Sequence, residues 1–168
     1  DRLRTFFAHA GQRGLVADFH VDETGDPEAA SLRVIAETVL ETGFDAPVTV
    51  GHCCSLAVQP DAEWLHTLDL VARAGIHVVS LPMCNLYLQD RHAGRTPRWR
   101  GVTLVHEMAA RGINVSFASD NTRDPFYAYG DLDMLEVMRE ATRIAHLDHS
   151  GNDWPGAFLT NPARACGF

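Results

Sequence analysis

The chain has 168 residues, and its hydrophobic fraction of 46% is high enough to bury a continuous core, which excludes intrinsic disorder. Its 22 acidic and 14 basic residues give a formal net charge of -8, so nucleic acid and anionic membranes would be repelled and a small neutral substrate is expected. No apolar run approaches the roughly 20 residues that cross a bilayer, and no secretory leader is recognisable.

Four short β-rich runs recur along the chain at intervals of roughly 30 to 40 residues. They cover residues 15–19, 48–51, 77–81 and 114–118. After each of them, apolar residues follow the i, i+3, i+4, i+7 spacing of an amphipathic helix. The stripes are Leu32, Ile35, Ala36, Val39 and Leu40; Leu65, Leu68, Val71 and Ala72; Val102, Val105 and Ala109; and Leu135, Met138 and Ala145.

A glycine stands just before each expected strand, where a left-handed residue would end the preceding helix and turn the chain back. These residues are Gly11, Gly43, Gly75 and Gly112, so a further helix is expected ahead of Gly11. The repeated cap indicates one repeated structural unit.

Alternating strands and helices with short links predict a parallel sheet covered by helices. His20, His52 and Asp120 each follow the end of an expected strand, where barrel enzymes collect their catalytic groups. No glycine-rich phosphate-binding loop follows a strand, so an open dinucleotide-binding sheet loses its main support. The pattern therefore favours a barrel.

A complete TIM-type barrel has eight units and about 250 residues, whereas about four βα units are recognisable in residues 1–168. We therefore expect an α/β fold in which this chain forms the C-terminal half of a hydrolase barrel. Four strands alone would leave two sheet edges unpaired. Either the chain is a fragment or two halves associate, and a homo-oligomer is expected.

The first candidate site is DFHVDE, residues 18–23, where a strand delivers an imidazole and the following turn delivers a carboxylate. His20 beside Glu23 suits a metal ligand next to a proton shuttle. The alternative is a hydrogen-bonded structural histidine with Glu23 at the start of a helix. His52 follows the second strand in the same relation and is expected to bind metal, to orient water or to be structural.

The last expected strand leads to a second group of polar candidates. Asp120 follows small and apolar residues, among which a lone carboxylate would be costly without a cation. The amide of Asn121 can bond a substrate carbonyl or ring nitrogen, or it can cap a turn. Phe126 lies in an aromatic loop, residues 123–130, which is expected to pack against a flat ring or against the protein itself.

The cysteines do not form a pattern of their own. They are Cys53, Cys54, Cys84 and Cys166, and no pair has CxxC spacing. This arrangement suits neither a disulfide framework nor a thiolate zinc cluster. We expect reduced thiols in a cytoplasmic protein, and nucleophilic cysteine catalysis is disfavoured.

Four motifs, DFHVDE, VTVGHCCS, LPMCNLYLQDR and SFASDNTRDPFYAYG, resemble bacterial cytosine deaminases of the amidohydrolase superfamily in order and spacing, over nearly the whole chain. The resemblance implies one divalent metal ion, Fe or Zn, with His20 as its ligand on the fifth barrel strand and Asp120 on the eighth. It also implies that Asp120 and His52 deprotonate and orient water and that Glu23 carries the proton to the ring nitrogen. Asn121 and Phe126 would bind the substrate.

The activity implied by the resemblance is hydrolytic deamination of a small amino-substituted nitrogen heterocycle, with cytosine to uracil and ammonia as the first choice. Asn121 and Phe126 replace an aspartate and a tryptophan of the family pattern, so isocytosine, creatinine or an aminotriazine are alternative substrates. The family's HxH and its substrate-reading glutamine do not occur in these residues and would lie upstream. A non-catalytic barrel fragment that serves in assembly is the alternative from another class.

Overall fold

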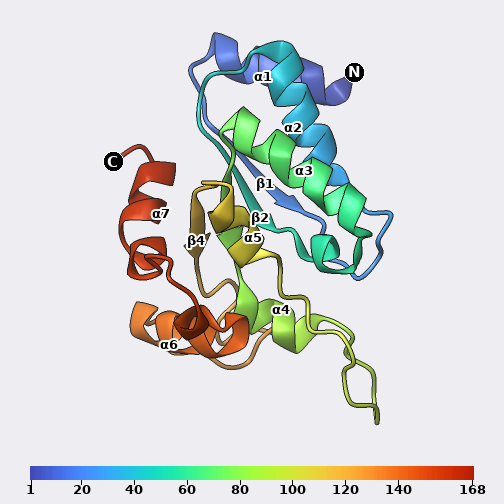
Figure 1. The fold of residues 1–168 in the computed structure, drawn as a ribbon, viewed down its shortest axis with the longest axis vertical. Helices are drawn as coiled ribbons and strands as arrows, with labels where there is room; N and C mark the ends of the chain where they lie inside the picture. The colour runs from blue at the N-terminus through green and yellow to red at the C-terminus, as the bar shows by residue number, and fades with distance from the viewer.

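The computed structural model describes residues 1–168 as strands and helices that alternate along the chain (Figure 1). The strands are β1 (Ala17–Val21), β2 (Val48–His52), β3 (His77–Ser80) and β4 (Val115–Phe117). The α-helices are α1 (Arg2–Gln12), α2 (Ser31–Thr42), α3 (Asp61–Ala74), α4 (Pro82–Leu88), α5 (Val105–Ala110), α6 (Met134–Ala145) and α7 (Thr160–Ala165). Short 3-10 helices cover Cys54–Val58, Leu147–His149 and Pro155–Phe158.

The strands form one parallel sheet in the order β1-β2-β3-β4. Each strand lies beside its predecessor in the chain, and the order never reverses as it does in a doubly wound sheet. Ala17 pairs with Val48, and Val21 pairs with His52, so β1 and β2 are in register up to the edge that carries the histidines. The expected barrel-type α/β fold is confirmed.

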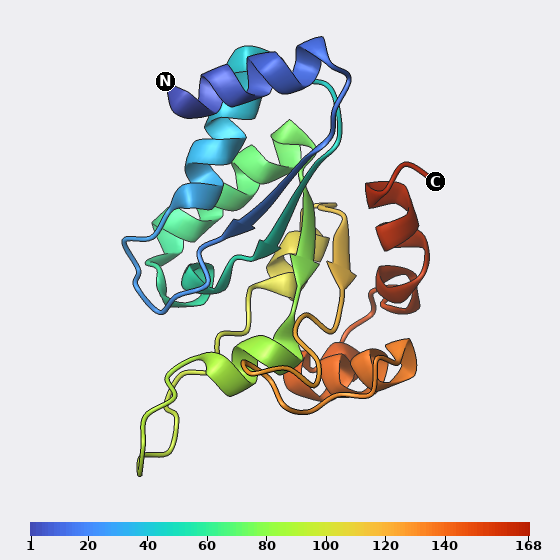
Figure 2. The same cartoon turned by 180° about the vertical axis from the view of Figure 1, so that it is seen from behind.

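Helices and sheet share one apolar core. Helices α2 and α3 lie side by side against the sheet, whereas α6 and α7 lie beside β4 (Figures 1 and 2). Val50 and Val78 of the sheet are fully buried, as is Leu68 of α3, and each such side chain contributes about 1.5 to 3 kcal/mol by burial. At the edge of the sheet formed by β4, the ring of Phe117 stacks on the ring of Phe158 with a centroid separation of 5.0 Å. None of the helices combines the length and apolar character that a membrane crossing requires.

Strand boundaries differ from the expected ones by up to two residues, which changes the position of the site. Strand β1 begins at Ala17 instead of Leu15, because Leu15 and Val16 approach the sheet unpaired and are 53% and 65% exposed. His20 therefore lies within β1, and His52 is the last residue of β2, rather than just past their strands. Asp120 does lie past its strand, since β4 ends at Phe117.

The glycine caps are confirmed at two helices and wrong at one. Gly43 and Gly75 end α2 and α3 with φ of 63° and 65°. Gly112 also has a positive φ, two residues after α5. Gly11 lies inside α1 instead, and the left-handed turn that follows this helix is made by Gly14.

Two helical predictions need correction. In α6 the buried residues are Val137, Ala141 and Ala145, whereas Leu135 and Met138 are exposed, because the helix carries apolar residues on more than one side. Helix α5 begins only at Val105, and α4 and α7 were not expected at all. Helix α4 matters most, since it lies directly after β3 and reaches the candidate site.

Candidate active site

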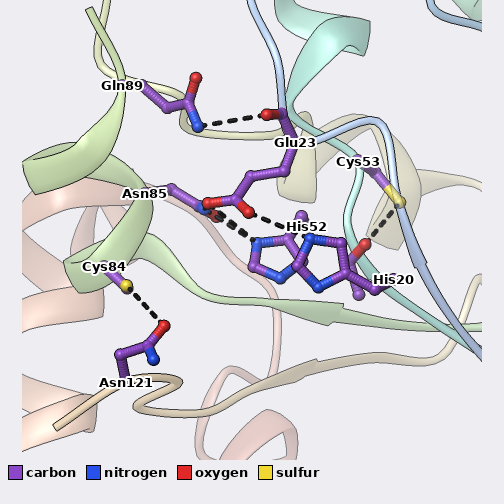
Figure 3. A network of polar contacts seen from close by, with 9 residues as sticks. His20, Glu23, His52, Cys53, Cys84, Asn85, Gln89 and Asn121 are labelled. Atoms are coloured by element: carbon purple, nitrogen blue, oxygen red, sulfur yellow. Dashed lines mark hydrogen bonds and ion pairs between the residues drawn. The ribbon is translucent and has the colours of Figure 1, made fainter. Parts of the chain in front are cut away.

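Two imidazoles and one carboxylate meet at the carboxyl ends of β1 and β2 (Figure 3). Nε2 of His20 lies 3.0 Å from Oε2 of Glu23, and Nδ1 of His52 lies 3.7 Å from Oε1 of the same residue. One ligand atom from each of the three residues lies within 4.8 Å of the others. The structure thus brings together three of the residues that sequence reasoning selected.

The turn after β1 holds Glu23 over the histidines. Asp22 has a left-handed φ of 53°, and its carboxylate accepts hydrogen bonds from the backbone N–H groups of Ser31 and Leu32, at 3.0 and 2.9 Å. These are the first N–H groups of α2, which have no partner inside the helix, so a carboxylate there is stabilising. Asp22 therefore ties the turn to α2, a role that the sequence analysis did not assign.

The three residues differ in exposure. The His20 side chain is 68% exposed, whereas the His52 side chain is only 3% exposed. A hollow of about 210 Å³ lies beside both rings and is lined from neighbouring strands by Asp18, Thr49 and Gly51 among others. Burial lowers the pKa of His52, and the neighbouring His20 lowers it too, while the charges of Glu23 and Asp120 oppose the shift.

Asp120 lies outside the group of three but carries a feature that suits a cation. Its Oδ2 atom is buried and has no hydrogen-bond partner, and a carboxylate oxygen in that state is costly unless a cation or a bound donor satisfies it. Imidazole and carboxylate together form a donor set that zinc or iron accepts. The residues present therefore fit the divalent ion that the sequence analysis expected.

Asn121 and Phe126, the two expected substrate-binding residues, lie in the loop after β4, and their polar groups form hydrogen bonds with other residues of the protein. Asn121 Nδ2 donates to Asp124 Oδ2 at 2.6 Å, and Cys84 Sγ donates to Asn121 Oδ1 at 3.5 Å. Phe126 is 62% exposed. The aromatic packing in this loop comes from Tyr127 and Tyr129, whose rings meet Tyr87 of α4 edge to face.

Helix α4 supplies the contacts that sequence reasoning missed. Asn85 is 1% exposed, and its Nδ2 lies 2.9 Å from Glu23 Oε1 and 2.9 Å from His52 Nδ1 (Figure 3). Gln89, just past the helix, donates to the backbone oxygen of Glu23 at 3.4 Å. Asn85 belongs to the LPMCNLYLQDR motif, but only the fold shows which atoms it contacts.

The buried thiols near the site are held in the neutral form. Burial raises the pKa values of the Cys53 and Cys54 thiols well above the ordinary value for cysteine. The pKa of the Cys84 thiol is raised to about 12, mainly by burial and then by the neighbouring carboxylate of Asp120. A thiolate is the reactive form of cysteine, so these residues are poor nucleophiles. Their surroundings agree with a site that does not use covalent cysteine catalysis.

The backbone of the site is strained in several places. Asp22, His52, Cys53 and Asp120 have φ values of 53°, 73°, 52° and 63°. A residue with a Cβ atom costs roughly 1 to 3 kcal/mol in such a conformation, and these conformations cluster at functional sites. At His52 the positive φ comes at the end of β2, so the ring leaves the alternation of the strand and turns toward Glu23.

Three comparisons show which known proteins this chain resembles. The whole chain, residues 1–168, matches the amidohydrolase family. It is 60% identical over 158 residues to a pterin deaminase from Rhizobium rhizogenes, covering 94% of this chain and 36% of that protein. The structure of a 5-methylcytosine deaminase from Klebsiella pneumoniae liganded with 5-fluorocytosine matches with a TM-score of 0.85 and 32% identity, over 98% of this chain and 40% of that one.

A third relative is named for the removal of an isopropylamino group instead of a free amino group. The structure of an N-isopropylammelide isopropylaminohydrolase from Burkholderia multivorans matches with a TM-score of 0.70 and 27% identity, over 99% of this chain and 40% of that one. The chain thus spans 36% to 40% of the length of these three relatives.

Proposed function

The chain belongs to the amidohydrolase family, and from this premise we propose that the protein is a metal-dependent enzyme that hydrolytically removes an amino group from a nitrogen heterocycle. The observation that carries the proposal is the meeting of His20, Glu23 and His52 at the carboxyl end of the sheet, within 4.8 Å of one another. The names of the pterin deaminase and of the 5-methylcytosine deaminase support the same reaction. Residues 1–168 would form the C-terminal part of the catalytic barrel, with the HxH strand upstream.

We assign metal binding in this part of the barrel to His20 and Asp120. His20 offers an exposed imidazole, and Asp120 offers a buried oxygen without a donor. The ion would be Fe or Zn, as for other sites of imidazole and carboxylate ligands. When bound, such an ion supplies Lewis-acid activation of water near neutral pH.

The protein's own side chains then divide the proton transfers. Asp120 accepts a proton from the attacking water, and His52 holds that water by a hydrogen bond, so its oxygen bonds to the ring carbon that bears the amino group. Glu23 delivers a proton to the adjacent ring nitrogen. Glu23 then takes the remaining proton from the new hydroxyl and gives it to the exocyclic nitrogen, the bond between the ring carbon and that nitrogen breaks with its electron pair leaving on ammonia, and the oxygen becomes a carbonyl. The proton held by Asp120 returns to Glu23. Asn121 and Phe126 would contact the substrate from the loop after β4.

A pterin is the substrate class that we favour. The 60% identity to a pterin deaminase extends over 94% of this chain. The pyrimidine ring of a pterin carries the amino and oxo groups of isocytosine, one of the alternatives that Asn121 suggests. Cytosine is the second candidate, supported by the 5-methylcytosine deaminase structure.

The deciding experiment is ammonia release from the full-length protein after its metal content has been measured. The panel contains pterin, isocytosine, cytosine, creatinine and an aminotriazine. Release from pterin and isocytosine alone supports the favoured substrate class, and release from cytosine alone supports the second candidate. A protein that binds neither metal nor any of these rings would instead be a non-catalytic barrel that serves in assembly.

The same preparation tests the proposed homo-oligomer. Strands β1 and β4 are each paired on one side only in these residues, so their other edges need cover from upstream strands or from a second copy. Light scattering of the full-length protein would give its mass in solution. A monomer at micromolar concentration would contradict the expected association.

A further inference from the structure

One buried amide contacts both of the groups to which we assign proton handling. Asn85 is 1% exposed and points its Nδ2 atom between Glu23 and His52 (Figure 3). Its two N–H bonds can serve two acceptors, and Nδ2 lies 2.9 Å both from Glu23 Oε1 and from His52 Nδ1, within hydrogen-bond distance of each. No other side chain forms hydrogen bonds to both Glu23 and His52.

The orientation of this amide follows from the chemistry of its partners. A carboxylate only accepts hydrogen bonds, so the end of the amide that faces Glu23 Oε1 must be the nitrogen, which only donates. The same nitrogen faces Nδ1 of His52, which therefore must present a lone pair. The proton of the neutral imidazole then lies on Nε2.

We propose that Asn85 is a positioning residue that holds His52 in the tautomer protonated at Nε2 and holds Glu23 by Oε1. In this state His52 is a hydrogen-bond donor toward the site, and it stabilises the oxygen that develops negative charge during attack. Glu23 keeps Oε2, the atom that faces His20, free of the amide. The catalytic part of this inference rests on the proposed function, whereas the tautomer does not.

The fold offers a matched control. Asn114 Nδ2 lies 3.0 Å from Nδ1 of His77, which is the same pair of groups at the amino end of the strands, away from the site. Asn114→Asp therefore changes an amide next to an imidazole without touching Glu23 or His52. Any effect that Asn85→Asp produces through general destabilisation of the sheet should also appear in Asn114→Asp.

The test is nitrogen NMR of full-length protein with ¹⁵N-labelled histidine, metal-free and zinc-loaded, with His52→Gln to identify the signal. At about pH 8, above the ordinary histidine pKa of about 6.5, the neutral tautomers give distinct nitrogen shifts. We expect Nε2–H in the wild type and Nδ1–H in Asn85→Asp, whose carboxylate only accepts. An Nδ1–H signal in the wild type would overturn the assignment, whichever heterocycle proves to be the substrate.

Kinetics tests the positioning role. We expect Asn85→Asp to lower kcat by about 10- to 100-fold with KM nearly unchanged, the range found for groups that orient active-site ligands. Asn85→Ser, whose hydroxyl can donate to only one of the two partners, should also lower kcat if the Asp variant fails to fold. Asn114→Asp should leave kcat unchanged. A folded Asn85→Ser enzyme with wild-type kcat would refute the positioning role.

Discussion

The imidazole rings of His20 and His52 lie with their centroids 4.0 Å apart and their planes inclined by 42°. They come from neighbouring parallel strands, in which the next residue of β1, Val21, pairs with His52. Strict alternation would put the His52 ring on the same face as Val21, opposite His20, so the positive φ of His52 is what turns its ring toward His20. The Glu23 carboxylate lies 3.0 Å from His20 and 3.7 Å from His52, so a substitution at any one of the three changes the contacts of the other two.

Asp120→Asn should abolish turnover without unfolding the protein. Asparagine keeps the shape of the side chain and tolerates the left-handed φ of 63° at this position, but it removes the charge that the proposed ion requires. We expect kcat to fall by more than about 100-fold, beyond the loss caused by outer-shell groups, together with a lower metal content. Asp45→Asn, at an exposed loop position, is the control, and full activity of the Asp120 variant would remove the assigned role.

His20→Asn should lower the metal content of the purified protein. The exposed imidazole of His20 hydrogen-bonds only to Glu23 and lies beside the ring of His52, so its loss should change the free energy of unfolding little while removing a ligand. Metal analysis after dialysis against a weak chelator gives the comparison, with the exposed His66→Asn as control. Equal metal in both variants would assign the ion to other residues.

Asn121→Asp should shift the kinetic preference between isocytosine and cytosine and should loosen the loop after β4. The new carboxylate would face Asp124 at the position where an N–H now donates over 2.6 Å. The double variant Asn121→Asp with Asp124→Asn restores one donor in the pair and should recover the lost stability. If the ratio of kcat/KM values for the two rings does not move in the single variant, Asn121 does not read the substrate.

Gly101→Ala should be more harmful than Gly94→Ala. Both glycines have positive φ, 68° and 71°, so both substitutions cost roughly 1 kcal/mol in backbone strain. A Cβ atom at Gly101 would also strike the side chain of Gln89 and lie 3.3 Å from Cβ of Asn85, whereas one at Gly94 meets nothing. We expect Gly101→Ala to have a lower kcat and a lower Tm than Gly94→Ala. Equal values for the two variants would show that Gln89 and Asn85 move to accommodate the new Cβ atom.

His77 should lower the free energy of unfolding as the pH falls below neutrality. Burial, followed by the charge of Arg164, lowers the pKa of His77 in the folded state below the ordinary value of about 6.5. Below about pH 6.5 the unfolded chain takes up a proton that the folded state resists, so the free energy of unfolding declines as pH falls. Urea unfolding between about pH 7.5 and about pH 5.5 should show a smaller decline in His77→Asn, whereas His66→Asn should behave like the wild type.

Much of the fold could be predicted because it depends on local patterns. The stripe of α2 and the caps at Gly43 and Gly75 are properties of neighbouring residues and are confirmed, whereas in α3 Leu68 and Val71 are buried but Leu65 is 38% exposed. The start of β1 was wrong because apolar character alone does not show where pairing begins, as Leu15 demonstrates. Helix α4 was missed because its seven residues are too few for a recognisable stripe.

The sequence predicted that His20, Glu23 and His52 lie at one site, but it did not predict the contacts of Asn85 with them. His20 and Glu23 are three residues apart, so their pairing was visible in the sequence. Asn85 lies 33 residues from His52 and 62 from Glu23, and no local pattern connects positions so distant. The roles of Asp120, Asn121 and Phe126 stay predictions until the variants are measured.

The left-handed backbone at Asp22, His52, Cys53 and Asp120 has a consequence for protein engineering. Substitutions that relax these residues would raise the melting temperature while moving the side chains that the site needs. Efforts to make the protein more heat-resistant should therefore target the amino ends of the strands and the outer faces of α2 and α3, where added stability does not compete with activity.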